Sequence, residues 1–288
     1  MSELISNADL ERIRALLYKE TGIYFEAKKD YFLKSRLQQR MQAQCCATFQ
    51  NYYKELLFTD REAELAFLIE EVTVNETYLF RDFPQLRGFA EDVLPSYLQA
   101  KRTKGNYSLN VWSAACSTGE EPYTLAIILR EMIDDYDRWN TNILATDIDR
   151  RVLRQARIGL YDERAIKETP TPYKQKYFRR TPDGWQVKPD IQEPVAFEQL
   201  NLMDRPGMRR KRAFDFIFCR NVLIYFSDDS RKQVLSALYD ALVPGGYVFL
   251  GHSESVGRIT ASFTLERIGD FLCYKKPGAV LPRPGSPS

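Results

Sequence analysis

Acidic side chains stand where a predicted helix follows directly on a predicted strand. The strand expected over residues 109–115 runs into Cys116–Gly119, and the helix after it begins with Glu120 and Glu121. In an open α/β sheet, ligands bind outside the carboxyl ends of the strands, so this turn is a candidate site. Two glutamates there would repel a pyrophosphate and attract a cation. The alternative is that they only stabilise the first helical turn, where acids are generally favoured.

The glutamates distinguish this turn from the common nucleotide-binding loops. The chain contains neither the GxGxxG pattern of dinucleotide-binding folds nor the GxxxxGK[ST] pattern of P-loops. A nucleoside ligand that carries positive charge is compatible with the two acids. S-adenosylmethionine, with its ammonium and sulfonium groups, is such a ligand.

A second acidic position ends the next predicted strand. Asp147 lies 26 residues after Glu121, near the spacing at which an acid binds the ribose hydroxyls of a nucleotide. An aspartate after a strand can also be a simple helix cap, but Asp149 is available for that role. Arg220 and Asn221 end a later strand and face the same crevice, although polar residues at strand ends are often only part of a turn.

Strands and helices alternate from residue 109 onward, which predicts an α/β domain. Continuous apolar strands between amphipathic helices are typical of a parallel sheet that helices cover on both faces. The last two strands are close enough in sequence to form an antiparallel hairpin at an edge of the sheet. The expected strands cover residues 109–115, 142–147, 196–201, 214–220, 247–251, 263–269 and 271–276, and the expected helices cover residues 122–133, 150–157 and 230–242.

The first hundred residues have helical periodicity instead. Ser6 or Asn7 can cap a first helix that Gly22 ends, and a second helix is expected over residues 27–44. Further helices follow, and Pro84 suits the first turn of the last of them. We therefore expect a small all-helical domain ahead of the sheet.

The boundaries of these parts follow from composition. The segment 101–108 is charged and lacks periodicity, so we expect a helical domain over residues 1–100 and an α/β domain over residues 101–276. Residues 159–194 interrupt the alternation of strands and helices, and Pro-Asp-Gly at residues 182–184 predicts a β-hairpin within a small β-rich insertion. Residues 277–288 are rich in proline and glycine, and we expect a disordered tail there.

Composition excludes several classes of function. Lys and Arg total 41 against 39 Asp and Glu, so the net charge of +2 gives no general attraction to nucleic acid or to a membrane surface. We expect neither a membrane span nor a signal peptide, and therefore a cytoplasmic protein. Its five cysteines form no CxxC pair and are expected to be reduced. With His252 as the single histidine, a zinc site or a histidine-based triad is not expected.

Four segments together resemble the chemotaxis receptor methyltransferase family, CheR. Asn75–Arg81 reads NETYLFR and is similar to the family's NET-x-F-F-R signature, while Trp112–Tyr123 is similar to its WSAACSTGEEPY cofactor loop. Cys219–Phe226 is similar to its CRNVLIYF segment, and Gly251–Glu254 to its closing strand. The resemblance covers nearly the whole chain. Leu79 departs from it, because the family usually has an aromatic residue there.

This resemblance implies both a fold and a reaction. The fold is a class I S-adenosylmethionine methyltransferase domain, Rossmann-like with a β-subdomain insertion, preceded by a small helical domain. The reaction transfers a methyl group from S-adenosylmethionine to glutamate side chains of chemoreceptors for sensory adaptation, with S-adenosylhomocysteine as product. Arg81 and Tyr225 are implied as catalytic residues nearest the transferred methyl. The residues implied around the cofactor are Asn75, Thr77, Arg81, Glu121 (with Glu120 as an alternative), Asp147, Asn201, Leu202, Arg220 and Asn221.

Such a transfer makes few demands on the protein. The acceptor carboxylate attacks the sulfonium methyl in line, and a glutamate with a reference pKa of about 4.3 is already ionised at pH 7. No general base and no metal are then required, which suits a chain with a single histidine. Alignment and exclusion of water remain as the tasks of the protein. We expect Arg81 to orient the carboxylate rather than to activate it.

The helical domain is the expected docking surface for the receptor. Lys29, Arg36 and Arg40 fall on one side of the helix expected over residues 27–44. A basic face would speed the encounter with acidic methylation helices and make it salt-dependent. Part of the family also captures a receptor pentapeptide on its β-subdomain as an added strand. Because residues 182–184 make only a tight turn here, we expect no pentapeptide tether.

The sequence was also compared with three alternative functions. A nucleic-acid methyltransferase would show an (N/D)PP(Y/F) motif or a cysteine motif for attack on a base, and residues 220–226 contain neither. A docking module without activity would not need the full set of pocket residues. A methyltransferase for small carboxylates is opposed only by the resemblance of the helical domain.

Overall fold

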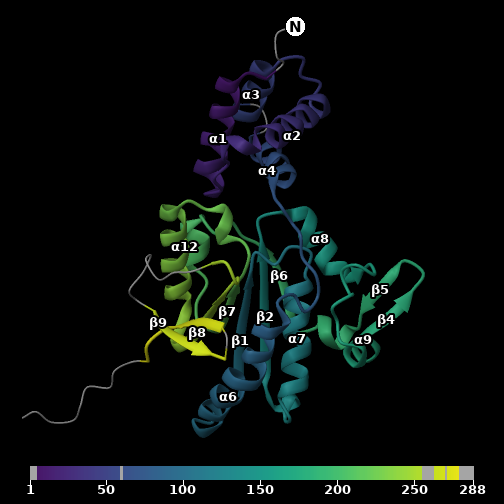
Figure 1. The fold of residues 1–288 in the computed structure, drawn as a ribbon, viewed down its shortest axis with the longest axis vertical. Coiled ribbons are helices and arrows are strands. Elements are labelled where there is room, and N and C mark those ends of the chain that lie inside the picture. Colours follow the sequence, from purple (N-terminus) through teal and green to yellow (C-terminus); the bar gives the residue numbers. More distant parts are fainter. Residues whose placement is uncertain (1–4, 59–60, 255–262, 270, 279–288) are drawn as a thin grey trace, which may run out of the picture.

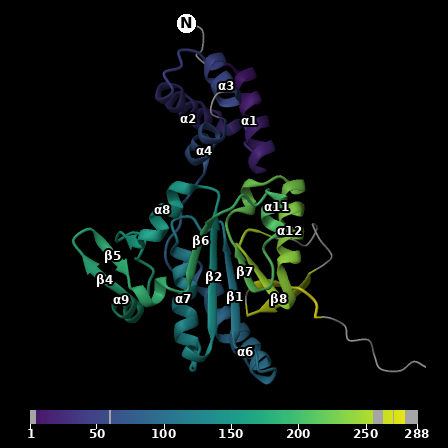
Figure 2. The same cartoon turned by 180° about the vertical axis from the view of Figure 1, so that it is seen from behind.

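The computed structural model describes residues 5–58, 61–254, 263–269 and 271–278. Figure 1 shows a bundle of helices stacked on a larger part that is built around a sheet. The same molecule seen from behind in Figure 2 has α1 over α12 and α4 over α8, as in the first view. The bundle therefore covers one end of the sheet.

Local sequence signals begin and end the helices of the bundle. The first helix is capped by Ser6, whose hydroxyl accepts from the backbone N–H of Asp9 at 3.2 Å, and it ends at Gly22 with φ +72°. The helix expected over residues 27–44 begins as a 3-10 turn and becomes α-helical only at Asp30. The bundle contains α1 (Asn7–Thr21), η1 (Ala27–Lys29), α2 (Asp30–Ala43), α3 (Phe49–Phe58) and α4 (Arg61–Val72).

The bundle and the α/β part meet near residues 73–75, not at the expected boundary over residues 101–108. The apolar core of the bundle ends with Val72. The next helices, α5 (Phe83–Gly88), the π-helix η2 (Phe89–Val93) and α6 (Leu94–Thr103), pack into the core of the sheet. Phe89 is the clearest case, because its ring lies within 5.0–5.4 Å of the rings of three phenylalanines on the sheet. Helical periodicity cannot tell which apolar core a helix will join.

A mostly parallel sheet of seven strands forms the α/β part, as predicted. Its strand order is β6-β2-β1-β7-β8-β10-β9. Only β10 runs antiparallel to the other strands, and it forms an edge hairpin with β9. The strands are β1 (Ser108–Ala114), β2 (Asn140–Asp147), β6 (Val195–Gln199), β7 (Phe214–Cys219), β8 (Leu242–Leu250), β9 (Thr264–Ile268) and β10 (Phe271–Lys275). The chain reverses direction across the sheet beside β1, so the carboxyl ends of β1, β2 and β7 enclose a crevice there.

Helices cover both faces of this sheet. One face carries α6, α7 (Glu120–Met132) and α8 (Arg150–Ile158), and the other carries α11 (Arg205–Arg209) and α12 (Asp228–Ala241). Short 3-10 turns, η3 (Tyr136–Arg138) and η4 (Leu223–Tyr225), connect elements at the two ends of the sheet. Of the strands between the two helical layers, β7 is buried throughout, whereas β6 and the start of β2 are partly exposed.

The β-rich segment forms a small sheet of its own. Its strand order is β3-β5-β4, and the predicted hairpin is confirmed, with Thr181 paired to Gly184 across the turn. The segment contains β3 (Leu160–Tyr161), α9 (Thr171–Tyr177), β4 (Phe178–Thr181), β5 (Gly184–Val187) and α10 (Pro189–Gln192). Of the expected tail over residues 277–288, all but the first two residues lie outside the described ranges.

Candidate functional site

A cavity of about 350 Å³ lies at the carboxyl edge of the sheet, under the helical bundle. Its wall is built by the loops after β1, β2, β6 and β7, by the linker after α4, and by the bundle itself. The structure places every site residue predicted from the sequence on this wall: Asn75, Thr77, Arg81, Glu121, Asp147, Asn201, Leu202, Arg220, Asn221 and Tyr225. Segments that are far apart in the chain therefore share one cavity.

The loop after β1 brings backbone atoms to the cavity. Ala115, Cys116 and Ser117 line it, and both Ala115 (φ +63°) and Ser117 (φ +49°) have left-handed backbone, which is unfavourable for residues with a Cβ. Gly119 (φ +94°) lets the loop pack closely on α8, because a Cβ there would lie 2.9 Å from the Cβ of Ala156. Strained backbone of this kind concentrates at ligand sites.

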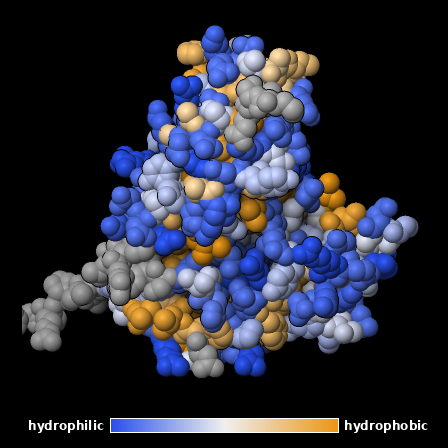
Figure 3. Space-filling model, turned by 45° about the horizontal axis from the view of Figure 1, so that its top comes forward, coloured by the Kyte–Doolittle hydropathy of each residue, from blue (hydrophilic) through white to orange (hydrophobic). Residues whose placement is uncertain are grey.

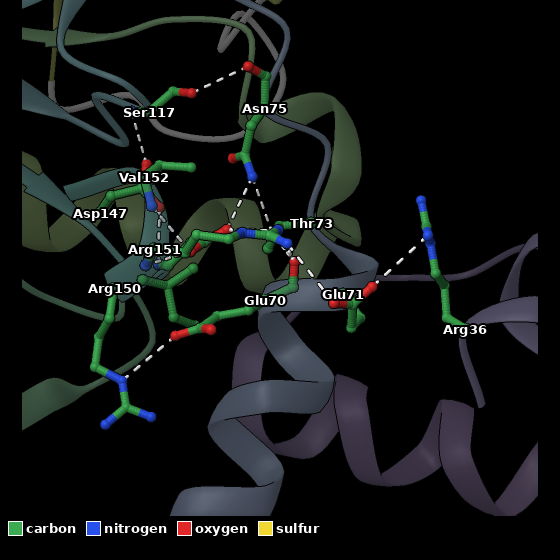
Figure 4. Close-up of polar contacts among 12 residues, drawn as sticks. Arg36, Glu70, Glu71, Thr73, Asn75, Ser117, Asp147, Arg150, Arg151 and Val152 are labelled. Carbon is green, nitrogen blue, oxygen red and sulfur yellow. Dashed lines mark hydrogen bonds and ion pairs between the residues drawn. The ribbon is translucent and has the colours of Figure 1, made fainter. Parts of the chain in front are cut away.

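Asp147 is the last residue of β2, and its side chain is buried at the cavity wall. One carboxylate oxygen accepts from Ser117 N–H at 2.8 Å (Figure 4), and the other accepts from Asp149 N–H at 2.9 Å. Burial outweighs these hydrogen bonds and raises the pKa of Asp147 to about 6. Each carboxylate oxygen has a further lone pair, so this group has the capacity to accept from sugar hydroxyls as well.

The two glutamates that begin α7 face different sides. Glu121 lines the cavity, where it accepts from Ser113 Oγ at 2.7 Å and from Arg220 Nη1 at 3.1 Å. Burial raises the pKa of Glu121, and the nearby Arg220 opposes that rise. Glu120 instead accepts from the Thr118 hydroxyl at 2.7 Å and lines a separate groove beside the β-subdomain. Of the two alternatives, the tertiary structure therefore brings Glu121 to the cavity.

Arg220 is a buried connector between three segments. Its Nη2 donates to the backbone carbonyl of Arg81 at 2.7 Å and to Asp82 Oδ2 at 2.8 Å, while Nη1 donates to Glu121. Its Nε is also buried and has no partner among the described residues. A buried donor without a partner is uncommon, and here it belongs to a residue on the cavity wall.

Two cations, Arg81 and Lys29, lie on the cavity wall. Arg81 donates from Nη1 to the carbonyl of Glu76 at 2.8 Å, and Lys29 Nζ lies 5.4 Å from the centre of the Tyr225 ring. Neither Arg81 nor Lys29 forms an ion pair with any residue that the structure describes. This side of the cavity is therefore suited to an anionic group.

The remaining predicted residues also hold the cavity wall together. Asn221 has left-handed backbone (φ +58°), and its N–H donates to Glu254 at 2.9 Å. Asn201 donates to the carbonyl of Glu20 at 2.6 Å, which ties the loop after β6 to the end of α1. Leu202 is buried in the core that lies behind this loop.

The sequence reasoning missed that the bundle forms part of the wall. Thr21, Ile23, Tyr24, Phe25 and Phe32 line the cavity. Tyr24 N–H donates to the Tyr225 carbonyl at 2.8 Å, and Ile23 forms an isolated β-bridge with Phe226. These contacts join segments some 200 residues apart, and nothing in their local pattern predicts them.

The expected basic docking face is not a single exposed surface. Arg40 is nearly buried and makes a two-pronged ion pair with the buried Glu64, at 2.5 and 3.0 Å. Arg36 lies near Glu71 at 3.6 Å, and Lys29 belongs to the cavity. The correction is that Arg40 stabilises the bundle, because an unpaired buried carboxylate would be costly.

The surface at the bundle end is otherwise mixed. Figure 3 shows hydrophilic side chains over most of this face and apolar ones in small, separate groups. Within the described ranges, no group of three or more His, Cys, Asp or Glu side chains could hold a metal ion. None of the helices described is both long and apolar enough to cross a membrane.

Comparison with known proteins matches both parts of the chain. Residues 8–73 match the family model described as "CheR methyltransferase, all-alpha domain", and residues 75–270 match "CheR methyltransferase, SAM binding domain". These ranges meet at the linker where the two cores separate.

Curated relatives match over nearly the full length. Chemotaxis protein methyltransferase 2 of Vibrio cholerae is 39% identical, with 96% of each chain covered. Chemotaxis protein methyltransferase 1 of Pseudomonas aeruginosa is 34% identical over 94% of this chain and 98% of its own. The chemotaxis protein methyltransferase of Escherichia coli is 33% identical over 91% of this chain and 89% of its own.

Proposed function

From the premise that this chain belongs to the CheR family of S-adenosylmethionine-binding chemotaxis methyltransferases, we propose that it methylates glutamate side chains of chemoreceptors. The observation that supports this acceptor is the pair of cations, Lys29 and Arg81, on the wall of the cavity without an ion-pair partner in the described chain. A substrate carboxylate would supply the missing negative charge.

The residues of the cavity fit the cofactor. Asp147 is a buried acceptor at the end of the second strand, the position that binds ribose hydroxyls in related α/β folds. Glu121 offers a carboxylate toward the positive charge of the ligand, and the unpartnered Nε of Arg220 offers a donor. We propose that these residues hold the cofactor with Asn75, Thr77, Arg81, Asn201, Leu202 and Asn221.

S-adenosylmethionine, when bound, supplies an electrophilic methyl group on a sulfonium. The protein has to align a glutamate carboxylate with this methyl group and to exclude water. Exclusion of water favours the transfer, because an anion and a cation react to give two neutral products. Arg81 is placed to orient the carboxylate, since among the described residues its guanidinium donates to one backbone carbonyl and lies over the Tyr78 ring, at 5.8 Å. Tyr225 lies on the same wall and is the second candidate near the reacting atoms.

Receptor docking is proposed for the helical domain, with a smaller set of cations than the sequence implied. Lys29 lines the cavity and Arg36 lies on the same helical segment, whereas Arg40 forms an ion pair with Glu64 inside the bundle. The methylation helices of the receptor would approach the mouth of the cavity between bundle and sheet. We propose that this takes place in the cytoplasm.

The acceptor assignment is tested by transfer of tritium-labelled methyl groups to receptor-containing membranes. Labelled product that releases methanol in base would show a glutamyl ester. The matched control is receptor in which the acceptor glutamates are replaced by alanine. Label that persists on this control, or transfer only to small carboxylic acids, would contradict the proposal, and complete absence of transfer would favour a docking module without activity.

We also propose that this protein does not capture a receptor pentapeptide. The turn between β4 and β5 contains only Pro182 and Asp183, since Thr181 already pairs with Gly184. Calorimetric titration with the free pentapeptide should give no heat, while S-adenosylhomocysteine binds the same preparation. Micromolar binding of the peptide would refute this point without affecting the proposed reaction.

A further inference from the structure

Asp149 is completely buried between the end of β2 and the start of α8, yet it does not line the cavity. We propose that Asp149 is a positioning residue that holds the linker between the two domains against the cofactor loop. This inference rests on the proposed placement of S-adenosylmethionine in the cavity. A sequence alone suggests for Asp149 only the role of a helix cap.

The two oxygens of the Asp149 carboxylate have different tasks. Oδ1 caps α8 by accepting from the N–H groups of Arg151 at 2.8 Å and Val152 at 3.2 Å. Oδ2 accepts from Thr73 Oγ1 at 3.1 Å and Asn75 Nδ2 at 2.9 Å, and Arg151 Nη2 of α8 lies 3.4 Å from it. Figure 4 shows Thr73 and Asn75 of the linker beside Arg151 and Val152 of α8. A cap alone would need only the first oxygen.

The linker contact closes a ring of hydrogen bonds around the cofactor loop. From Asp149 Oδ2 the ring passes to the Asn75 side chain, and the Asn75 carbonyl accepts from Ser117 Oγ at 3.1 Å. Ser117 N–H donates to Asp147, and Asp147 accepts in turn from Asp149 N–H. Three members of the ring line the cavity, and Asp149 is the one that lies behind it. Loss of Asp149 would therefore leave Asn75 and Ser117 free to shift relative to Asp147.

Arginines on α8 extend this attachment to the bundle. Arg151 donates to the carbonyl of Glu70 and lies 3.6 Å from Glu71, while Arg150 lies 3.5 Å from Glu70. Glu71 also meets Arg36 of α2 at 3.6 Å. The end of α4 is thus held on α8, so the position of Asn75 and the position of the bundle are set together.

The substitution Asp149→Ser separates the two tasks. Serine caps a helix about as well as aspartate, so α8 keeps its cap, but its short hydroxyl cannot also reach Thr73 and Asn75. We expect Asp149→Ser to weaken S-adenosylhomocysteine binding by about tenfold or more in calorimetry, because charge-assisted hydrogen bonds that fix the wall are lost. The double variant with Asn75→Ala should be no weaker than Asn75→Ala alone, since both act through the same contact.

Two controls make the result decisive. Asp147→Ala tests the cofactor site itself: if it loses affinity and folded Asp149→Ser binds normally, the positioning role is wrong and the proposed site stands. If the wild type does not bind S-adenosylhomocysteine, or if Asp147→Ala leaves its binding unchanged, both the site and the inference fail. Should Asp149→Ser not fold, Thr73→Val replaces the hydroxyl that lies between Oδ2, the Glu70 carbonyl and the Asn75 amide. Unchanged affinity in that variant would overturn the proposal, and an affinity lowered by about threefold or more would support it.

Discussion

The guanidinium of Arg220 donates to the carboxylate of Glu121 at 3.1 Å and, with its other terminal nitrogen, to the backbone carbonyl of Arg81 at 2.7 Å. The end of β7, the first turn of α7 and the segment after the linker are thereby joined at one buried side chain. The position of Arg81 depends on such contacts. For each substitution of a cavity residue, the stability of the fold is therefore measured together with binding or turnover.

Asp147→Ala is expected to weaken binding of S-adenosylhomocysteine by about tenfold or more, because hydrogen bonds to a charged acceptor are lost. The N–H groups of Ser117 and Asp149 also lose their acceptor. Isothermal calorimetry measures the effect. Glu120→Gln is the control, since Glu120 lies outside the cavity and its replacement should leave the affinity unchanged. Equal affinities of Asp147→Ala and wild type would exclude the ribose assignment.

Glu120 makes the stability of the fold depend on pH. Burial raises its pKa from the ordinary value of 4.5 to about 7. A carboxyl group whose pKa is raised by folding stabilises the folded state. This stabilisation is fully present below pH 4.5 and is lost as the pH rises through 7. The glutamine of Glu120→Gln does not titrate. Between pH 5 and pH 8 the free energy of unfolding of wild type should therefore fall by up to about 3 kcal/mol relative to that of this variant. Urea unfolding at both pH values tests this, and a constant difference would contradict it.

Arg81→Ala should lower turnover by about 100-fold, the cost of a misplaced reactant. Its side chain holds little of the fold, so the free energy of unfolding should change by only about 0.5 kcal/mol. Methyl transfer and thermal unfolding monitored by circular dichroism are the paired measurements. If the variant loses its fold, Arg81 is a structural residue and the orienting role is wrong.

Tyr225→Phe removes a single hydroxyl and keeps the ring beside Lys29. If the hydroxyl contacts the reacting groups, turnover should fall by about tenfold with no change in thermal stability. Normal turnover would show that the ring is needed for packing alone.

Lys29 and Arg40 should behave in opposite ways although the sequence places them on one helix face. Arg40→Met breaks the buried pair with Glu64 and should reduce the free energy of unfolding by about 3–5 kcal/mol. Lys29→Met should change stability by about 0.5 kcal/mol and instead raise the KM for receptor and weaken its salt dependence. A stable Arg40→Met variant with impaired docking would restore the original interpretation of a basic face.

Much of the fold is readable from local pattern. The switch from helical periodicity to alternating apolar strands at residue 109 predicts the α/β class. The first helix is also predicted, with Gly22 at its end, although Ser6 and Asn7 are both candidate caps and the structure has Ser6. Chemistry at strand ends is also local, because carboxyl ends of neighbouring parallel strands must meet at one edge. Asp147, Arg220 and one of the two glutamates at 120 and 121 could therefore be assigned to one crevice, and Glu121, Asp147 and Arg220 line the cavity.

Only the tertiary structure decided which contacts each side chain makes across the two domains. Local spacing does not distinguish Arg40, which pairs with a buried carboxylate, from Lys29, which reaches the cavity. Nor could it choose between Glu120 and Glu121, because adjacent residues of a helix differ by about 100° in direction and the position of the neighbouring loops decides which one is enclosed. The boundary near residue 74 and the second oxygen of Asp149 depend likewise on packing between distant segments. Periodicity and motifs determine what an element is and where its chemistry lies, whereas burial and partners arise only when the elements pack together.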